Sequence, residues 1–289
     1  MLVASDWKSY RIIDASNKEK LEVWNNVTLL RPSPEIIWDD RELYYDYKDS
    51  IDAIYHRSST GGGAWKNLKN VPSRWTIDYK DLKFNLKQMG FKHTGLFPEQ
   101  AVNWDFIMDK IKTSNRKDVK VLNLFGYTGA ASVAALKAGA SVCHVDSSKG
   151  MNEWCKENVA LNKLEDKSIR YLTDDVLKFV KREIRRGNKY DGIIMDPPSY
   201  GKGANGEIWT FEANIKELVE LTSELLSDNA LFFIVNSYSA GYSGIIVKNL
   251  IEKNISNDGF VYTDEIGLEI EKDNLILPCG VTTKWESKN

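Results

Sequence analysis

The feature that most constrains the fold is a strand, a glycine turn and a helix at residues 119–138. Residues 119–124 form a short, largely apolar run that predicts a buried strand, and the small residues at 130–138 predict a helix. Gly126 and Gly129 lie in the turn between them. Glycine lets the backbone approach a ligand closely, and such a turn directs backbone N–H groups and a helix N-terminus towards it. This order predicts the opening of a nucleotide-binding α/β unit.

The chain after residue 119 alternates between strand-like and helix-like segments. We expect strands at 119–124, 141–145, 168–172, 191–195 and 230–236, and helices at 130–138, 148–162, 175–186, 211–226 and 243–254. This alternation predicts an α/β fold with a doubly wound, mostly parallel sheet and helices on both faces. The runs 259–270 and 275–285 have no helix between them, so we expect them to pair antiparallel at one edge of the sheet.

The first 72 residues have a different character. They contain short β-like runs separated by turn residues, and they predict a small β-rich N-terminal domain (1–72), a candidate for substrate recognition, before the main domain (73–289). Six of the nine tryptophans fall before residue 110. They could form a stacking surface for unpaired bases, but the filling of a small core is the preferred interpretation.

Composition excludes several classes of protein. No apolar run approaches the roughly 20 residues of a membrane span, and the N-terminus lacks the features of a secretory signal. Three cysteines without metal-ligand spacing predict no metal site, and we expect a cytoplasmic protein. The net charge of −2 neither favours nor excludes a nucleic-acid substrate.

Polar residues follow each of the first four strands of the predicted sheet. The first strand leads into the turn around Gly126 and the second ends at Asp146, 17 residues beyond Gly129; the third ends at Asp174-Asp175 and the fourth at Asp196-Pro-Pro. In such sheets the ligand lies beyond the carboxyl ends of the strands. The turn carries no basic residue for a phosphate, so a phosphate-free nucleoside such as S-adenosylmethionine fits better than a dinucleotide. Asp146 would accept the ribose hydroxyls and Asp175 or Asp174 the adenine amino group.

With these residues the chain resembles a class I S-adenosylmethionine-dependent methyltransferase. More narrowly, it is similar to the family of bacterial 23S ribosomal RNA 5-methylcytosine methyltransferases and their relatives, over roughly residue 78 to the C-terminus. The motifs are Thr94-Gly-Leu-Phe-Pro-Glu-Gln100, Asn123-Leu-Phe-Gly-Tyr-Thr-Gly129, Val145-Asp146-Ser147, Asp174-Asp175-Val176 and Asp196-Pro-Pro198. The resemblance implies seven strands, the last inserted antiparallel. The expected cofactor-binding residues are Phe97, Gln100, Asn123, Phe125, Gly126, Tyr127, Thr128, Gly129, Asp146, Ser147, Asp174, Asp175, Val176 and Asp196.

The methyl acceptor is left open between carbon and nitrogen. Methylation at C5 of cytosine needs a thiolate nucleophile, but the family's cysteine slot reads Ser237-Tyr-Ser239, and Asp-Pro-Pro is followed by Ser199. Cys279 is either a relocated nucleophile or, preferably, an inert thiol. For a nitrogen acceptor, Asp196 and the Pro197 carbonyl would accept hydrogen bonds from an amino group. Amino-methylating enzymes carry a stacking aromatic directly after the prolines, whereas here Tyr200 comes one residue later.

These observations predict an enzyme that methylates RNA, with ribosomal RNA favoured, and Asp196, Pro197 and Tyr200 as its catalytic residues. One alternative is a methyltransferase acting on a protein or small molecule. Another is a non-catalytic RNA-associated module that keeps the cofactor fold.

Basic residues recur at helical spacing between Lys178 and Lys189. They would form either a phosphate-binding stripe or, as we prefer, a solvated helix face.

Overall fold

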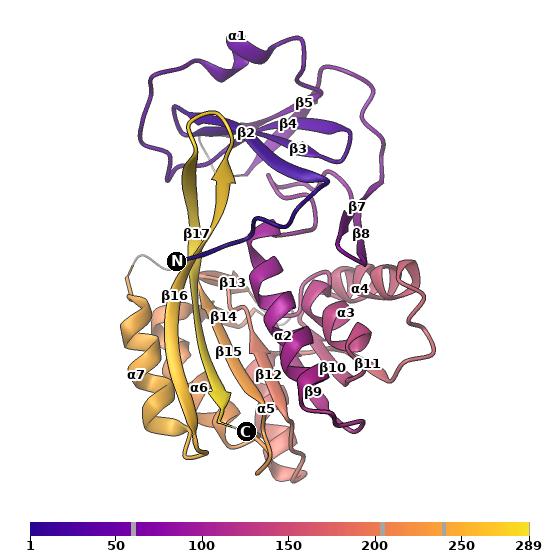
Figure 1. Ribbon diagram of the computed structural model, residues 1–289, viewed down its shortest axis with the longest axis vertical. Helices are drawn as coiled ribbons and strands as arrows, with labels where there is room; N and C mark the ends of the chain where they lie inside the picture. Colours follow the sequence, from indigo (N-terminus) through magenta and orange to yellow (C-terminus); the bar gives the residue numbers. More distant parts are fainter. Residues whose placement is uncertain (59–61, 203–205, 239–240, 289) are drawn as a thin grey trace. The chain divides into compact units, whose positions relative to one another are not determined.

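The computed structural model describes residues 1–58, 62–202, 206–238 and 241–288 (Figure 1). The chain divides into two units. The C-terminal unit comprises Met1, Val102–Ile266 and Gly280–Asn289, and the N-terminal unit comprises Leu2–Ala101 and Gly267–Cys279. The expected boundary between residues 72 and 73 falls inside the N-terminal unit, because the segment after it bonds back to the start of the chain: Ser9 Oγ donates to the Asp78 carbonyl at 2.6 Å.

The sheet of the C-terminal unit runs in the order β11-β10-β9-β12-β15-β17-β16 over the described residues. The strands are β9 (Lys120–Leu124), β10 (Ser141–Asp146), β11 (Ile169–Thr173), β12 (Gly192–Met195), β15 (Phe232–Ser237), β16 (Gly259–Ile270) and β17 (Leu275–Ser287). The first five pair parallel, and β17 lies antiparallel against β15. The doubly wound, mostly parallel sheet and its antiparallel last strand are thus confirmed.

Helices cover both faces of this sheet (Figure 1). They are α2 (Ala101–Thr113), α3 (Ala130–Lys137), α4 (Lys149–Leu161), α5 (Val176–Arg185), α6 (Phe211–Ser223) and α7 (Gly244–Asn254). Alternate strand residues such as Leu122, Ile193 and Phe233 form one core with α5, α6 and α7. The intervening residues face the other way, as Phe232 does towards Phe106 of α2 at 6.0 Å between ring centroids. Because both faces are covered, β12 and the first four residues of β15 are continuously apolar rather than alternating.

The N-terminal unit is β-rich, as expected. Its strands are β1 (Leu2–Val3), β2 (Tyr10–Ser16), β3 (Glu19–Trp24), β4 (Val27–Pro32), β5 (Ala53–Arg57), β6 (Gly63–Asn67), β7 (Trp75–Tyr79) and β8 (Leu82–Leu86), with the short helices α1 (Leu43–Tyr47) and η1 (Pro98–Gln100). β2, β3 and β4 form an antiparallel meander, and β7 and β8 form a hairpin.

The tryptophans of the N-terminal unit are structural. Trp24 and Trp75 are buried. The indole N–H groups of Trp7, Trp38 and Trp65 donate to backbone carbonyls within 3.0 Å. These contacts support core filling rather than a stacking surface.

Candidate active site

Backbone hydrogen bonds join the carboxyl ends of four strands in the C-terminal unit. Gly126 N donates to the Val145 carbonyl at 3.0 Å, which links the turn after β9 to the end of β10. Asp174 N donates to the Asp146 carbonyl at 3.2 Å, and Asp196 N donates to the Leu124 carbonyl at 3.4 Å. The glycine turn and the acidic ends of β10, β11 and β12 therefore lie along one edge of the sheet.

Both turn positions require glycine because side chains fill the space beneath them. A Cβ on Gly126 would lie 2.3 Å from Cε1 of His144, and a Cβ on Gly129 would lie 2.1 Å from Sγ of Cys155. Gly129 also has φ +84°, a left-handed conformation that favours glycine. The turn is thus fitted closely against β10 and α4.

A chain of buried polar contacts supports the turn from below. Asn123 Nδ2 donates to Ser132 Oγ at 2.9 Å, and Ser132 Oγ lies 2.9 Å from Nδ1 of His144. Sγ of Cys155 is 3.7 Å from the same nitrogen. Burial lowers the pKa of His144 to about 4, so the ring is neutral near pH 7. His144 appears as an ordinary core residue in the sequence, and only the fold reveals this support.

Asp146 directs its carboxylate at the glycine turn. Its Oδ2 accepts from Tyr127 N at 2.9 Å and its Oδ1 accepts from Ser148 N at 2.8 Å. Burial raises its pKa. Phe125 and Tyr127 both have positive φ values, +55° and +51°, so the backbone of the turn is strained. Strain of this kind is common where backbone groups are aimed at a ligand.

The two carboxylates at the end of β11 have structural partners. Oδ1 of Asp175 accepts from Lys178 N at 2.9 Å and so caps α5. Asp174 forms an ion pair with Arg182. Val176 is buried in the core. Contact of Asp174 or Asp175 with adenine stays a prediction.

The Asp196-Pro-Pro segment leads into a β-hairpin. β13 (Tyr200–Lys202) pairs antiparallel with β14 (Ile208–Thr210), and residues 203–205 lie outside the described part of the chain. Trp209 Nε1 donates to the Pro198 carbonyl at 2.7 Å, and its ring lies 4.9 Å from that of Phe125. The hairpin therefore packs the Asp-Pro-Pro segment against the glycine turn. Tyr200 is 56% exposed beside it.

The remaining predicted residues occupy three kinds of position. Ser147 is exposed just after β10, and Thr128 is buried with its carbonyl accepting from Asn158 Nδ2 at 2.9 Å. Phe97 and Gln100 belong to the N-terminal unit, where Gln100 N donates to the Phe97 carbonyl at 3.1 Å. Their role at the cofactor stays a prediction.

None of the three cysteines is an activated nucleophile. Cys143 and Cys155 are buried in the C-terminal unit, and burial raises the pKa of both thiols. Cys279 belongs to the N-terminal unit, where burial, with a smaller effect of Glu99, raises the pKa of its thiol. A protonated thiol is a poor nucleophile.

Most basic residues of α5 and its C-terminal end are engaged by acidic or carbonyl groups. Lys181 pairs with Glu217 at 2.7 Å, Arg186 with Glu183 at 3.1 Å, and Lys178 with Glu207. Lys189 Nζ donates to the Glu224 carbonyl at 2.6 Å. These pairs favour a solvated helix face over a phosphate-binding stripe.

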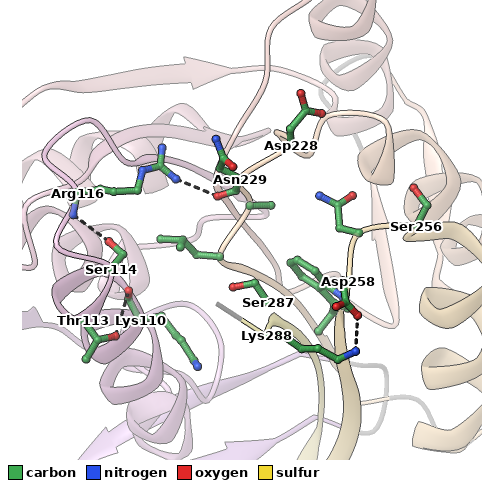
Figure 2. A pocket seen from close by; sticks show the side chains of 14 residues that line it. Lys110, Thr113, Ser114, Arg116, Asp228, Asn229, Ser256, Asp258, Ser287 and Lys288 are labelled. Atoms are coloured by element: carbon green, nitrogen blue, oxygen red, sulfur yellow. Dashed lines mark hydrogen bonds and ion pairs between the residues drawn. The ribbon is translucent and has the colours of Figure 1, made fainter.

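A cavity of about 800 Å³ lies at the opposite edge of the sheet (Figure 2). It is lined by residues that precede β9, β15 and β16 and that follow β17, so it is remote from the acidic strand ends. Arg116 donates to the Asn229 carbonyl at 2.9 Å, and Lys288 pairs with Asp258 (Figure 2). Its charged groups therefore hold loops together.

The described residues contain neither a membrane-spanning helix nor a metal-binding cluster. No helix there is long and apolar enough to cross a bilayer. No group of three or more His, Cys, Asp and Glu side chains there is arranged to hold a metal ion.

Comparison with known proteins identifies a family and similar folds. The model of the S-adenosylmethionine-dependent methyltransferase family matches residues 53–253. The crystal structure of a SAM-dependent methyltransferase from Agrobacterium tumefaciens is 33% identical, with a TM-score of 0.93, over 99% of this chain and 93% of that one. SMU.776, solved in complex with SAH, shares the fold at 19% identity and a TM-score of 0.75, over 97% of this chain and 76% of that one.

A curated relative is named for an RNA substrate. The ribosomal RNA large subunit methyltransferase K/L of Shewanella frigidimarina is 36% identical over 157 residues, which are 54% of this chain and 21% of that protein. The chain thus spans about a fifth of the length of that relative.

Proposed function

This chain belongs to the S-adenosylmethionine-dependent methyltransferase family, and we propose that it methylates RNA, with ribosomal RNA as the favoured substrate. The choice of RNA is supported by the name of the curated relative from Shewanella frigidimarina. The observation that carries the proposal is the gathering of the glycine turn, Asp146 and Asp196 along one edge of the sheet by backbone hydrogen bonds.

The residues around the turn suit a nucleoside with a charged amino-acid tail. We assign Asp146 to the ribose hydroxyls, because its carboxylate oxygens keep acceptor capacity beyond the two backbone donors they already have. The turn that contains Gly126 and Gly129 would lie under the methionine part, since Tyr127 N and the strained backbone of the turn lie beside Asp146. Asp175 or Asp174 would accept from the adenine amino group. When bound, S-adenosylmethionine supplies an electrophilic methyl group.

The residues around Asp196 fit a nitrogen atom as the methyl acceptor better than a carbon atom. Addition at C6 of a pyrimidine requires a thiolate, and the pKa of every cysteine thiol in the chain is raised. Asp196 and the Pro197 carbonyl are instead suited to accept hydrogen bonds from an exocyclic amino group of a base. This would orient the nitrogen lone pair for in-line attack, and positioning alone can accelerate such a reaction strongly. The exposed ring of Tyr200 would stack on the base.

Transfer of labelled methyl groups to ribosomal RNA from cells that lack this gene tests the proposal. The wild-type protein should label the RNA. Asp196→Ala should lower kcat by about 100-fold or more, because it removes an acceptor that orients the amino group. Calorimetry on both proteins reports whether the cofactor still binds. Cofactor binding by the wild type without any label in RNA would contradict the proposal and favour the non-catalytic module.

A protein or small-molecule substrate is the second candidate. The paired basic residues of α5, such as Lys181 with Glu217, favour it, because they leave that helix face without an evident phosphate-binding stripe. Activity on an RNA substrate should weaken steeply as salt rises. Activity that is insensitive to salt and directed at a non-nucleic substrate would favour this second candidate.

A further inference from the structure

We propose that the ring of Tyr238 forms a second stacking surface for the base that is methylated. This rests on the RNA methyltransferase function proposed above, and it assigns a binding role to a residue outside the predicted site. The side chain that follows β15 would then contact the substrate as a flat aromatic surface, at a position where the sequence offers no cysteine.

The position of Tyr238 is fixed by the register of the sheet. It directly follows β15, and β12 pairs with β15 in parallel with Met195 opposite Val235. β12 ends at Met195 and β15 at Ser237, so the Asp-Pro-Pro segment and Tyr238 each follow the carboxyl end of one of two adjacent parallel strands. The tyrosine therefore belongs to the same edge of the sheet as the proposed acceptor groups.

A glycine on the neighbouring strand makes room for the ring. β15 and β17 pair antiparallel with Ser237 opposite Val281, so Tyr238 comes opposite Gly280. A Cβ on Gly280 would lie 2.7 and 2.8 Å from Cδ1 and Cε1 of the Tyr238 ring, and 3.1 Å from the Ser237 carbonyl oxygen. The ring thus lies directly against the backbone of β17, and any larger residue at 280 would displace it.

The ring also remains accessible. Tyr238 is 36% exposed although one part of the ring rests on Gly280. Tyr242, in the same loop, differs: its ring lies 6.4 Å from that of Phe211, and its hydroxyl donates to the Glu212 carbonyl at 3.4 Å. One tyrosine of the loop therefore packs against α6, whereas Tyr238 follows β15 with part of its side chain exposed.

Buried hydrogen bonds fix the backbone that carries Tyr238. Asn236 pairs with Thr282 across the sheet, two residues before Tyr238. Asn103 Nδ2 donates to Asn236 Oδ1 at 3.0 Å, and Thr282 Oγ1 donates to Asn103 Oδ1 at 3.2 Å. Since α2, β15 and β17 are tied together here, the platform is preorganised and loses little freedom on binding.

The chemistry of the platform favours a planar ring. A base that leaves its stack can lie on an aromatic side chain whatever its sequence, because every base has a π-face. Tyr200, 56% exposed after the prolines, is the first such surface, and Tyr238 follows the adjacent strand. An unpaired nucleobase is therefore the ligand class that an exposed aromatic ring at either position suits.

The test compares methylation of ribosomal RNA by variants at residue 238. Tyr238→Ala should lower kcat/KM for RNA about ten-fold or more, mainly through KM, while the cofactor Kd stays within two-fold of the wild type. Tyr238→Phe keeps the ring and should retain near wild-type kcat/KM. Gly280→Ala displaces the ring and should resemble Tyr238→Ala, with circular dichroism to confirm that it folds. Phe260→Ala is the control, because Phe260 is 57% exposed where β16 begins, at the opposite edge.

The outcomes separate this inference from the function on which it rests. A wild-type protein that methylates RNA, with Tyr238→Ala equally active, would overturn the stacking role alone. An equal loss in Tyr238→Phe and Tyr238→Ala would also overturn it, since the hydroxyl and not the ring would then matter. A wild-type protein that transfers no methyl group to RNA would overturn both.

Discussion

Single residues determine the shape of the proposed cofactor turn, and Gly129 illustrates how. Two separate effects exclude a side chain there: the left-handed φ of +84° and the sulfur of Cys155, 2.1 Å from the place of a Cβ. Gly139 has only the first effect, with φ +105° and nothing within 4 Å of a Cβ. A comparison of substitutions at Gly129 and Gly139 therefore separates the cost of backbone strain from the cost of steric overlap.

We expect Gly129→Ala to destabilise the protein by about 2 kcal/mol more than Gly139→Ala, because it adds overpacking to the strain. Urea unfolding of both variants measures this difference. Cys155→Ala in the Gly129→Ala background should recover part of it by removing the sulfur, because the Cβ of residue 155 would still lie 2.9 Å away. Equal losses for the two glycine variants would show that no steric overlap exists beneath the turn.

The buried ring of His144 links stability to pH. Folding lowers the pKa of His144 from 6.5 to about 4. Between pH 4 and pH 6.5 the ring is therefore protonated in the unfolded chain but neutral in the folded protein. The contribution of neutral His144 to the free energy of unfolding is fully present above pH 6.5 and is lost as the pH falls towards 4. At pH 5 the loss from this residue should be about 2 kcal/mol.

Urea unfolding at pH 7 and pH 5 checks this expectation. His144→Asn is the matched variant, because an amide can still hydrogen-bond Ser132 Oγ but does not titrate. The difference between the two pH values should shrink by about 2 kcal/mol in the variant. Other groups, such as His93 with a pKa of about 4, contribute equally to both proteins and cancel. An unchanged pH dependence would contradict the assigned neutral state.

Among the strands and helices, the two edges of the sheet have different roles. The carboxyl edge carries the proposed site, whereas the opposite edge is held by Asp191 at the start of β12. Its Oδ2 accepts from Lys120 N at 2.8 Å, and its Oδ1 accepts from Ser227 Oγ at 2.7 Å and pairs with Arg116 at 3.0 Å. One buried carboxylate thus anchors β9, β12 and the loop before β15.

Asp191→Ala should lower the free energy of unfolding by about 3 kcal/mol, because it leaves buried partners unsatisfied. The cofactor Kd should stay unchanged, since the site lies at the other edge. Asp118→Ala is the control: Asp118 pairs with the same Arg116, at 3.4 Å, but its side chain is 80% exposed. Urea unfolding and calorimetry give the two quantities. Asp191→Ala that is no more costly than Asp118→Ala would contradict the anchoring role.

The whole molecule shows which features a sequence reveals. The order of strands and helices after residue 119 was predictable because fully buried parallel strands and amphipathic helices leave strong local patterns. The inclusion of Gly267–Cys279 in the N-terminal unit was not predictable. It depends on pairing between Ile270 and Ile12, which are 258 positions apart, and no local pattern encodes such a contact.

The proposed site was partly predictable for the same reason. Acidic and glycine residues at strand ends are visible as motifs, and the structure places the glycine turn, Asp146 and Asp196 along one edge. The support by His144 and the pairing of Tyr238 with Gly280 arise from strands that meet only in the fold. Asp175 shows the converse, because the structure gives it a capping role that competes with its expected contact with adenine.

The most direct test of the account is nucleoside mass spectrometry of ribosomal RNA methylated by the purified protein with isotopically labelled S-adenosylmethionine. We predict a labelled methyl group on the exocyclic amino nitrogen of a base, absent when Asp196→Ala is used. A labelled 5-methylpyrimidine would contradict the account, because that product requires an ionised thiol and every cysteine in the chain has a raised pKa.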